Sequence, residues 1–127
     1  MCIRDDRGSA AVEFVLVGVL LTGLTLIILQ VGLAVYVRHL VHDAAVEGAY
    51  HAALADVSLD EGAERARAVV DRTIGDGFVS AAHARESNRL GEPTVEVTVV
   101  ATMPLVGLIG IPSAWEVTAH APDSRLP

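Results

Sequence analysis

A stretch of 24 residues without one charged side chain, from Phe14 to Val37, constrains this chain more than any other feature of its sequence. At the rise of an α-helix the stretch is about 36 Å long, whereas the hydrocarbon core of a bilayer is about 30 Å thick. A core helix of a soluble bundle is the alternative, but the remaining residues lack the further apolar helices that would have to surround it. The stretch therefore predicts a helix that crosses a membrane with some tilt.

Two arginines, Arg4 and Arg7, precede this apolar stretch, as they do in a cleaved secretory signal. The apolar part of such a signal is only about 7 to 15 residues long, and here Glu13 would stand at its threshold. We therefore expect the stretch to be retained in the protein, as a transmembrane helix over residues 9–37.

The charge of the chain excludes some classes of partner. The formal net charge is -7 and there is no lysine. Because nucleic-acid binding needs a basic patch, no nucleic-acid partner is expected. The single cysteine, Cys2, cannot form an intramolecular disulfide, so folding does not depend on oxidation.

Beyond the apolar stretch, Arg38 and His39 mark the expected membrane interface, and no proline or glycine pair interrupts the helical pattern until about Ala55. Small apolar residues recur there at intervals of three and four, which predicts a helix over 38–55 that can pack closely against another helix. These residues are Leu40, Val41, Ala44, Ala45, Ala49, Ala52 and Ala53.

A second helix is expected over residues 59–74. Ser58 followed by Glu61 has the form of a capping box, and Gly75 is a suitable stop. The apolar side of this helix would consist of Ala63, Ala66, Val69, Val70 and Ile74.

The hydrophobic period then changes to two, which predicts strands over 94–102 and 114–121, with a third near 78–83. A small antiparallel sheet laid against the helices would bury the valine faces and Trp115. The sequence therefore predicts an α+β fold, in which a long N-terminal transmembrane helix continues into a stalk and a second helix packs on the sheet.

An uncharged, proline-bearing stretch, residues 103–112, lies between the last two expected strands. Loops are usually polar, so this one is expected to touch something apolar. Its large side chains either cover the core of the domain itself or contact a partner or the membrane, and both readings stay open. The side chains concerned are Leu105, Val106, Leu108 and Ile109.

Neither a metal site nor a catalytic centre is expected. A closed metal site needs about four converging ligands, and a hydrated helix surface explains the polar residues after the span better. A catalytic triad would need a nucleophile elbow or a Gly-rich oxyanion loop, which this chain lacks. We therefore expect no enzyme activity, metal or cofactor. The residues weighed are His39, His42, His51, Asp43 and Glu47 as metal ligands, and Ser80, His83 and Asp76 as a triad.

The most informative motif stands at the start of the apolar stretch. Gly8 precedes Glu13, a lone acid at the edge of the expected helix, by five residues. This is the pattern of a prepilin-type processing site, where a small flexible residue lets a peptidase grip an extended backbone. Arg4 and Arg7 help to keep this end on the cytoplasmic side. A plain signal anchor, with Glu13 at the headgroup level by chance, is the alternative.

The residues from Gly8 to Phe14 and the apolar run after them resemble the N-terminus of TadE-like proteins, the minor pilins or pseudopilins of the tight-adherence (Flp) type IV pilus system. The resemblance continues through Tyr36-Val37-Arg38 and through 44–49. It extends to the strand over 95–101 and to the apolar loop and Thr/Ala-rich strand that follow. It implies a pilin-like fold over nearly the whole chain.

The resemblance also implies a processing route. The prepilin peptidase would remove residues 1–8 as a leader peptide and leave Ser9 as the new N-terminus, with Glu13 and Phe14 recognised during processing and assembly. The protein would sit in the cytoplasmic (inner) membrane, N-terminus inside and 38–127 outside, and would help to assemble a Tad pilus with the assembly platform and other pilins. A signal-anchored protein with a small extracytoplasmic binding or enzymatic domain is the alternative.

Overall fold

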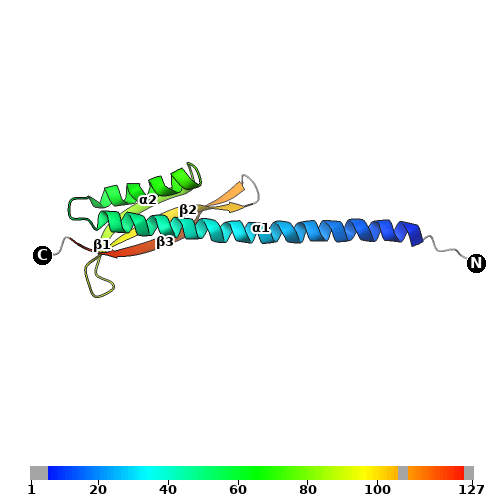
Figure 1. The fold of residues 1–127 in the computed structure, drawn as a ribbon, viewed down its shortest axis with the longest axis horizontal. Helices are drawn as coiled ribbons and strands as arrows, with labels where there is room; N and C mark the ends of the chain where they lie inside the picture. Colours follow the sequence, from blue (N-terminus) through cyan, green and yellow to red (C-terminus); the bar gives the residue numbers. More distant parts are fainter. Residues whose placement is uncertain (1–5, 106–108, 125–127) are drawn as a thin grey trace, which may run out of the picture. The chain divides into compact units, whose positions relative to one another are not determined.

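The computed structural model describes residues 6–105 and 109–124, which form two helices and one three-stranded antiparallel sheet (Figure 1). The elements are α1 Asp6–Ala52, α2 Leu59–Thr73, β1 Val79–Ser87, β2 Thr94–Leu105 and β3 Ile109–Pro122. The chain divides into two compact units, Met1–Gly32 and Leu33–Pro127, and α1 contributes to both. The predicted α+β class is confirmed.

In the unit Met1–Gly32, α1 exposes a long series of large apolar side chains, with Phe14 81% exposed. The hydroxyls of Thr22 and Thr25 each donate a hydrogen bond of 2.8 Å to a carbonyl one turn earlier, so these polar groups are satisfied within the helix. The apolar candidate span, Gly8–Ala52, has a mean hydropathy of 2.5 over its most apolar window. Within the part of the chain that the structure describes, α1 is the one helix long and apolar enough to cross a membrane.

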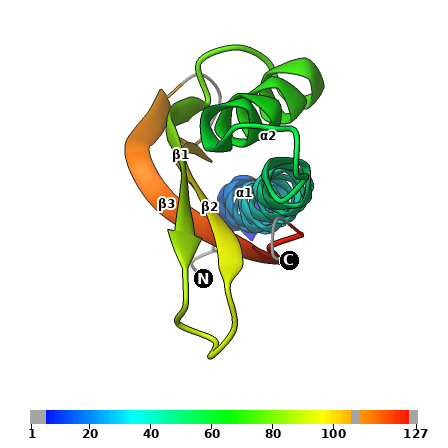
Figure 2. The same ribbon diagram turned by 90° about the vertical axis from the view of Figure 1, so that its left-hand side faces the viewer.

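In the unit Leu33–Pro127, the last part of α1 and the whole of α2 cover one face of the sheet (Figure 2). The strand order is β1-β2-β3, and both pairs are antiparallel. Alternate residues of β2 and β3 face the helices, as the period of two predicts, and Trp115 packs against this core while staying partly exposed. The fully buried members of the core include Val41, Ala44, Ala45, Ala49, Ala66, Val70, Val95, Val97, Val99 and Ala101.

The small residues of α1 allow α2 to approach it very closely. A Cβ atom added to Gly62 of α2 would lie 2.2 Å from the Cβ of Ala52, and one added to Gly48 of α1 would lie 2.6 Å from the carbonyl oxygen of Gly62. Real side chains do not come this near, so only glycine fits at both positions. The expectation that the helix after the apolar stretch packs against another helix is confirmed.

The expected capping box starts α2. The backbone N–H of Ser58 donates to a carboxylate oxygen of Glu61 at 2.8 Å, and the Ser58 hydroxyl accepts from the Glu61 N–H at 3.3 Å. These two bonds satisfy donors that a helix start would otherwise leave free. The Glu61 carboxylate accepts from the Ser58 backbone N–H and also from the Ser58 hydroxyl, at 3.1 Å. These two bonds lower the pKa of Glu61 below its usual value, since a carboxylate accepts hydrogen bonds best when it is charged. Gly75, at φ 124°, follows the end of α2.

The first helix ends three residues earlier than the pattern of small residues suggests, at Ala52 rather than near Ala55. The carbonyl of Ala53 accepts a hydrogen bond of 3.2 Å from the backbone N–H of Ser124, and a second bond from the hydroxyl of the same serine. This carbonyl is therefore used by the end of the chain rather than by a further helical turn. The contact also fastens the residues after β3 to the end of α1.

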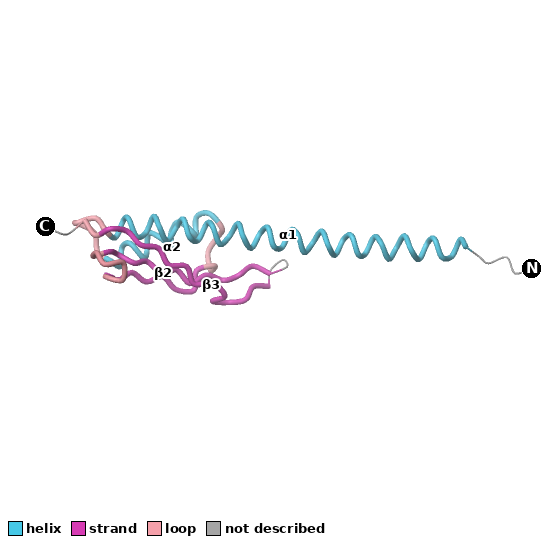
Figure 3. The backbone as a smooth tube through the Cα atoms, turned by 90° about the horizontal axis from the view of Figure 1, so that it is seen from below, coloured by secondary structure: helices cyan, strands magenta, loops and turns pink. Residues whose placement is uncertain are grey.

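The strands are longer than their hydrophobic alternation predicts. β1 extends to Ser87 rather than 83, and the stretch expected to be a loop, residues 103–112, is mostly strand. Met103 lies opposite Ile111 and Leu105 opposite Ile109, so β2 and β3 continue as a ribbon past the start of β1 (Figure 3). Backbone pairing in an antiparallel ribbon does not require alternating side chains, so the sequence pattern missed it. Residues 106–108 lie outside the described part.

Candidate functional site

The predicted processing residues lie at the start of α1. Gly8 and Ser9 both lie within α1, so the peptide bond between them is helical rather than extended. Apart from its chain neighbours and the nearby backbone of its own helix, a Cβ atom added to Gly8 would meet no described atom within 4 Å. Packing in the folded chain therefore does not require glycine at this position.

The two residues expected to act in recognition and assembly, Glu13 and Phe14, are both exposed on α1. They stand at the start of the uncharged stretch, inside the candidate span Gly8–Ala52.

Two of the four residues expected to contact a partner lie in the described strands. Leu105 ends β2 and Ile109 begins β3, and the two residues lie opposite each other in the register. Val106 and Leu108 lie outside the described residues.

A buried carboxylate that was not predicted from the sequence lies on the middle strand of the sheet, between charged or polar residues of the two outer strands. Arg85 of β1, Glu96 of β2 and His120 of β3 are direct neighbours in the register. The Glu96 side chain is only 2% exposed, and its Oε1 accepts from the Arg85 Nε at 2.9 Å. The His120 Nδ1 lies 3.8 Å from Oε2 of the same carboxylate. Glu96 is buried by residues of the two neighbouring strands. The alternating pattern of its own strand predicts only a polar side chain at this position and not its burial.

The pKa of Glu96 reflects this setting. Burial pushes the pKa upward, but the hydrogen bond and charge of Arg85, with smaller contributions from Arg89 and His120, hold it below the usual 4.5. A carboxyl group whose pKa is lower in the folded than in the unfolded state stabilises the fold above the unfolded-state value. This contribution is lost as the pH falls through the lowered, folded-state pKa.

We expect Arg85→Gln to lower the free energy of unfolding by about 2 kcal/mol at pH 7, because it leaves the buried carboxylate of Glu96 without its cation. The loss should shrink as the pH falls toward 4, where protonation of Glu96 removes the unpaired charge. Urea unfolding of the full chain in detergent, followed by Trp115 fluorescence, measures both values. Glu96→Gln is the matched control and should cost less, because the exposed Arg85 regains water. An equal cost of Arg85→Gln at pH 7 and 4 would contradict this account.

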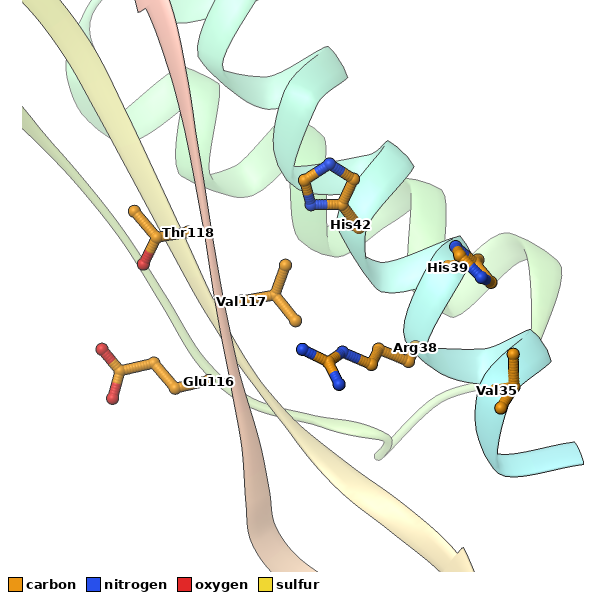
Figure 4. Close-up of a pocket in the computed structure, with 7 residues that line it drawn as sticks. All are labelled: Val35, Arg38, His39, His42, Glu116, Val117 and Thr118. Carbon is orange, nitrogen blue, oxygen red and sulfur yellow. The ribbon is translucent and has the colours of Figure 1, made fainter. Parts of the chain in front are cut away.

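A pocket of about 480 Å³ lies between one face of α1 and β3, within the unit Leu33–Pro127 (Figure 4). Arg38 extends from α1 toward β3, Val117 points toward α1, and Glu116 projects to the other side of the strand. The lining residues are Val35, Arg38, His39, His42, Glu116, Val117 and Thr118.

The histidines and acids weighed as metal ligands do not converge. Over residues 6–105 and 109–124, no group of three or more His, Cys, Asp or Glu side chains could hold a metal ion. His39 and His42 both line the pocket. Glu47 instead pairs with Arg65 of α2, whose Nε donates a hydrogen bond of 2.8 Å to the Glu47 Oε1.

The match to a known protein family lies in α1. Residues 8–49 match the family model of TadE-like proteins. The matched segment begins at Gly8, includes Glu13 and the whole uncharged stretch, and ends one residue after Gly48, where α1 and α2 meet. The TadE-like resemblance is therefore confirmed over this segment, and the family is one of pilin-like proteins associated with the Tad pilus rather than of enzymes. No curated protein and no solved structure gave a match to the chain.

Proposed function

We propose that this protein is a minor pilin or pseudopilin that takes part in assembly of a Tad (Flp) type IV pilus after a prepilin peptidase has removed residues 1–8. The observation that carries the proposal is the coincidence of three features in one segment. The TadE-like match begins at Gly8, Glu13 follows five residues later, and α1 then exposes its apolar side chains.

The glycine at position 8 supports processing rather than packing. No neighbour excludes a side chain there, so the folded chain alone gives no reason for it. A peptidase active site that binds extended backbone does give one, since glycine adopts the required conformations without steric cost. The helix would have to unwind around Gly8 for cleavage, and glycine is a poor helix former, which makes that opening easier.

The proposed topology places the N-terminus in the cytoplasm and the domain over 38–127 outside the cytoplasmic membrane. Arg4 and Arg7 precede the span and Arg38 follows it, so the bias of basic residues favours this orientation only slightly. If the peptidase removes residues 1–8 on the cytoplasmic side, as proposed, the N-terminus has to lie on that side as well. In the membrane, the partners would be the peptidase, the pilus assembly platform and other pilins. The proposed contact with such a partner is the apolar stretch that contains Leu105, Val106, Leu108 and Ile109.

Glu13 has a specific part in this proposal. Cleavage before Ser9 creates a positively charged amine four residues from Glu13, on this subunit or on a neighbour. A carboxylate drawn from the headgroup boundary into an apolar fibre would lose its water, so pairing with such an amine becomes valuable. The N-terminal end of the helix adds a favourable field.

We expect Glu13→Gln to be inserted and cut normally but to reduce pilus yield about tenfold or more, which corresponds to the loss of one charge-assisted bond. Mass spectrometry of the membrane extract gives the N-terminus, and sheared fibre protein from the same cells gives the yield. Glu47→Gln is the matched control, because its carboxylate pairs with Arg65 on the surface. Unchanged pilus yield in Glu13→Gln would refute the assembly role. A chain that keeps Met1 would favour the signal-anchored alternative.

A further inference from the structure

The pocket between α1 and β3 stands at a defined depth along the first helix. Arg38 immediately follows the uncharged stretch that begins at Phe14, and Glu13 immediately precedes it. At the helical rise, the 25 steps from Glu13 to Arg38 span about 37 Å, close to the separation of the two headgroup layers of a bilayer. If α1 crosses a membrane, as the proposed function requires, Arg38 lies among the phosphates of the outer leaflet.

The helix wall of the pocket carries groups that suit a phosphate. Arg38 presents a planar guanidinium with paired N–H donors, and His39 and His42 add imidazole nitrogens on the same face of α1. Guanidinium groups bind phosphate oxygens in a bidentate manner, and such charge-assisted hydrogen bonds are roughly twice as strong as those between neutral groups. The opposite wall, β3, is an edge strand, and such a strand presents N–H groups on its outer side at alternate residues.

The charges around the pocket leave Arg38 available. Arg65 pairs with Glu47 and Arg85 pairs with Glu96, whereas no described residue forms an ion pair with Arg38. The one acid among the seven lining residues, Glu116, projects to the far side of β3 (Figure 4). In a chain of net charge -7, this wall is therefore a local cationic site.

We propose that this pocket binds the phosphate of a membrane phospholipid, with Arg38 as the bidentate donor and His42 as a second donor. A free phosphate ion offers the same oxygens, but it would not explain why the pocket opens at the end of an apolar span. The binding would fix the depth of α1 in the outer leaflet and hold the unit Leu33–Pro127 against the membrane surface.

The test uses the full chain purified in a neutral sugar detergent. Native mass spectrometry counts bound lipid during titration with dioleoylphosphatidylglycerol or with dioleoylglycerol, which has the same acyl chains but no phosphate. We expect retention of the phosphate-bearing lipid alone, and a dissociation constant raised about tenfold or more in Arg38→Gln, as expected for one charge-assisted contact. His42→Gln should show a smaller increase. Arg72→Gln, which removes an exposed arginine of α2 outside the pocket, should bind as the unchanged chain does.

Three results would overturn the lipid site. These are equal retention of the two lipids, unchanged affinity in both Arg38→Gln and His42→Gln, and displacement of the lipid by millimolar inorganic phosphate. Near-ultraviolet circular dichroism of each variant verifies that its fold is intact. Cleavage after Gly8 and carbonate-resistant membrane insertion are scored in the same cells. Failure of these two readouts would count against the proposed function, whereas normal processing with no lipid preference would count against the phosphate site alone.

Discussion

The Gly8→Leu variant should accumulate as the uncut chain, with cleavage slowed about 100-fold or more, because displacement of the scissile backbone by as little as 1 Å can cost that much in rate. A leucine also stabilises the helical conformation of α1 around position 8, since it is a much better helix former than glycine. Both effects oppose the extended conformation that a peptidase needs. Mass spectrometry of membrane extracts, after a pulse of expression, gives the ratio of uncut to cut chain.

The design of this experiment separates processing from folding. Gly18→Leu is the matched control, because Gly18 also lies on α1 with nothing within 4 Å of an added Cβ, yet it is ten residues beyond Gly8. Gly18→Leu should be cut at the normal rate and leave Ser9 as the first residue. Normal cleavage of Gly8→Leu would show that the peptidase does not require glycine at this position, and the prepilin assignment would then be wrong.

The Gly62→Leu variant should lose at least about 3 kcal/mol of unfolding free energy, the upper range for overpacking in a core. Even a single Cβ atom would lie 2.2 Å from the Cβ of Ala52, so α2 has to move away from α1. That movement would expose Ala66 and Val70, which are fully buried. Thermal unfolding of the detergent-solubilised chain, followed by Trp115 fluorescence, should show a lower Tm.

Two companion variants make this result specific. Glu64→Leu introduces the same side chain at an exposed position of α2 and should change the stability by less than about 0.5 kcal/mol. Ala52→Gly removes the methyl group that a Cβ atom at position 62 would meet. The double variant Ala52→Gly/Gly62→Ala should therefore be more stable than Gly62→Ala alone. If Gly62→Leu were as stable as Glu64→Leu, the close approach of the two helices would be wrong.

Structural features that depend on residues close together in the chain could be predicted from the sequence. The capping box at Ser58 and Glu61 is made by side chains three residues apart, and α2 starts where it predicts. The alternation of β2 that begins at Val95 is buried as expected, because a period of two places one set of side chains on one face. The sequence did not predict that β2 would extend to Leu105, because the ribbon there is held by backbone pairing rather than by a side-chain pattern.

Of the residues proposed to act, Gly8 and Glu13 were identified from the sequence, since their spacing along one helix is itself the signal. The pocket around Arg38 was not, although Arg38 was placed at the membrane interface. Its second wall comes from Val117 and its neighbours on β3, about 80 positions later in the chain. No local pattern could connect the two walls before the packing of α1 on the sheet was known.

By itself, the sequence determined that the first helix is long and apolar enough to cross a membrane, and that a second helix and a sheet come after it. Helical rise, capping and alternation act over a few residues, so the order of amino acids is sufficient to specify them. Only the tertiary structure decided that Gly62 must be glycine and that Glu96 is a buried charge beside Arg85. These properties arise from the distance between helices and the register between strands, which the packing of the whole core sets.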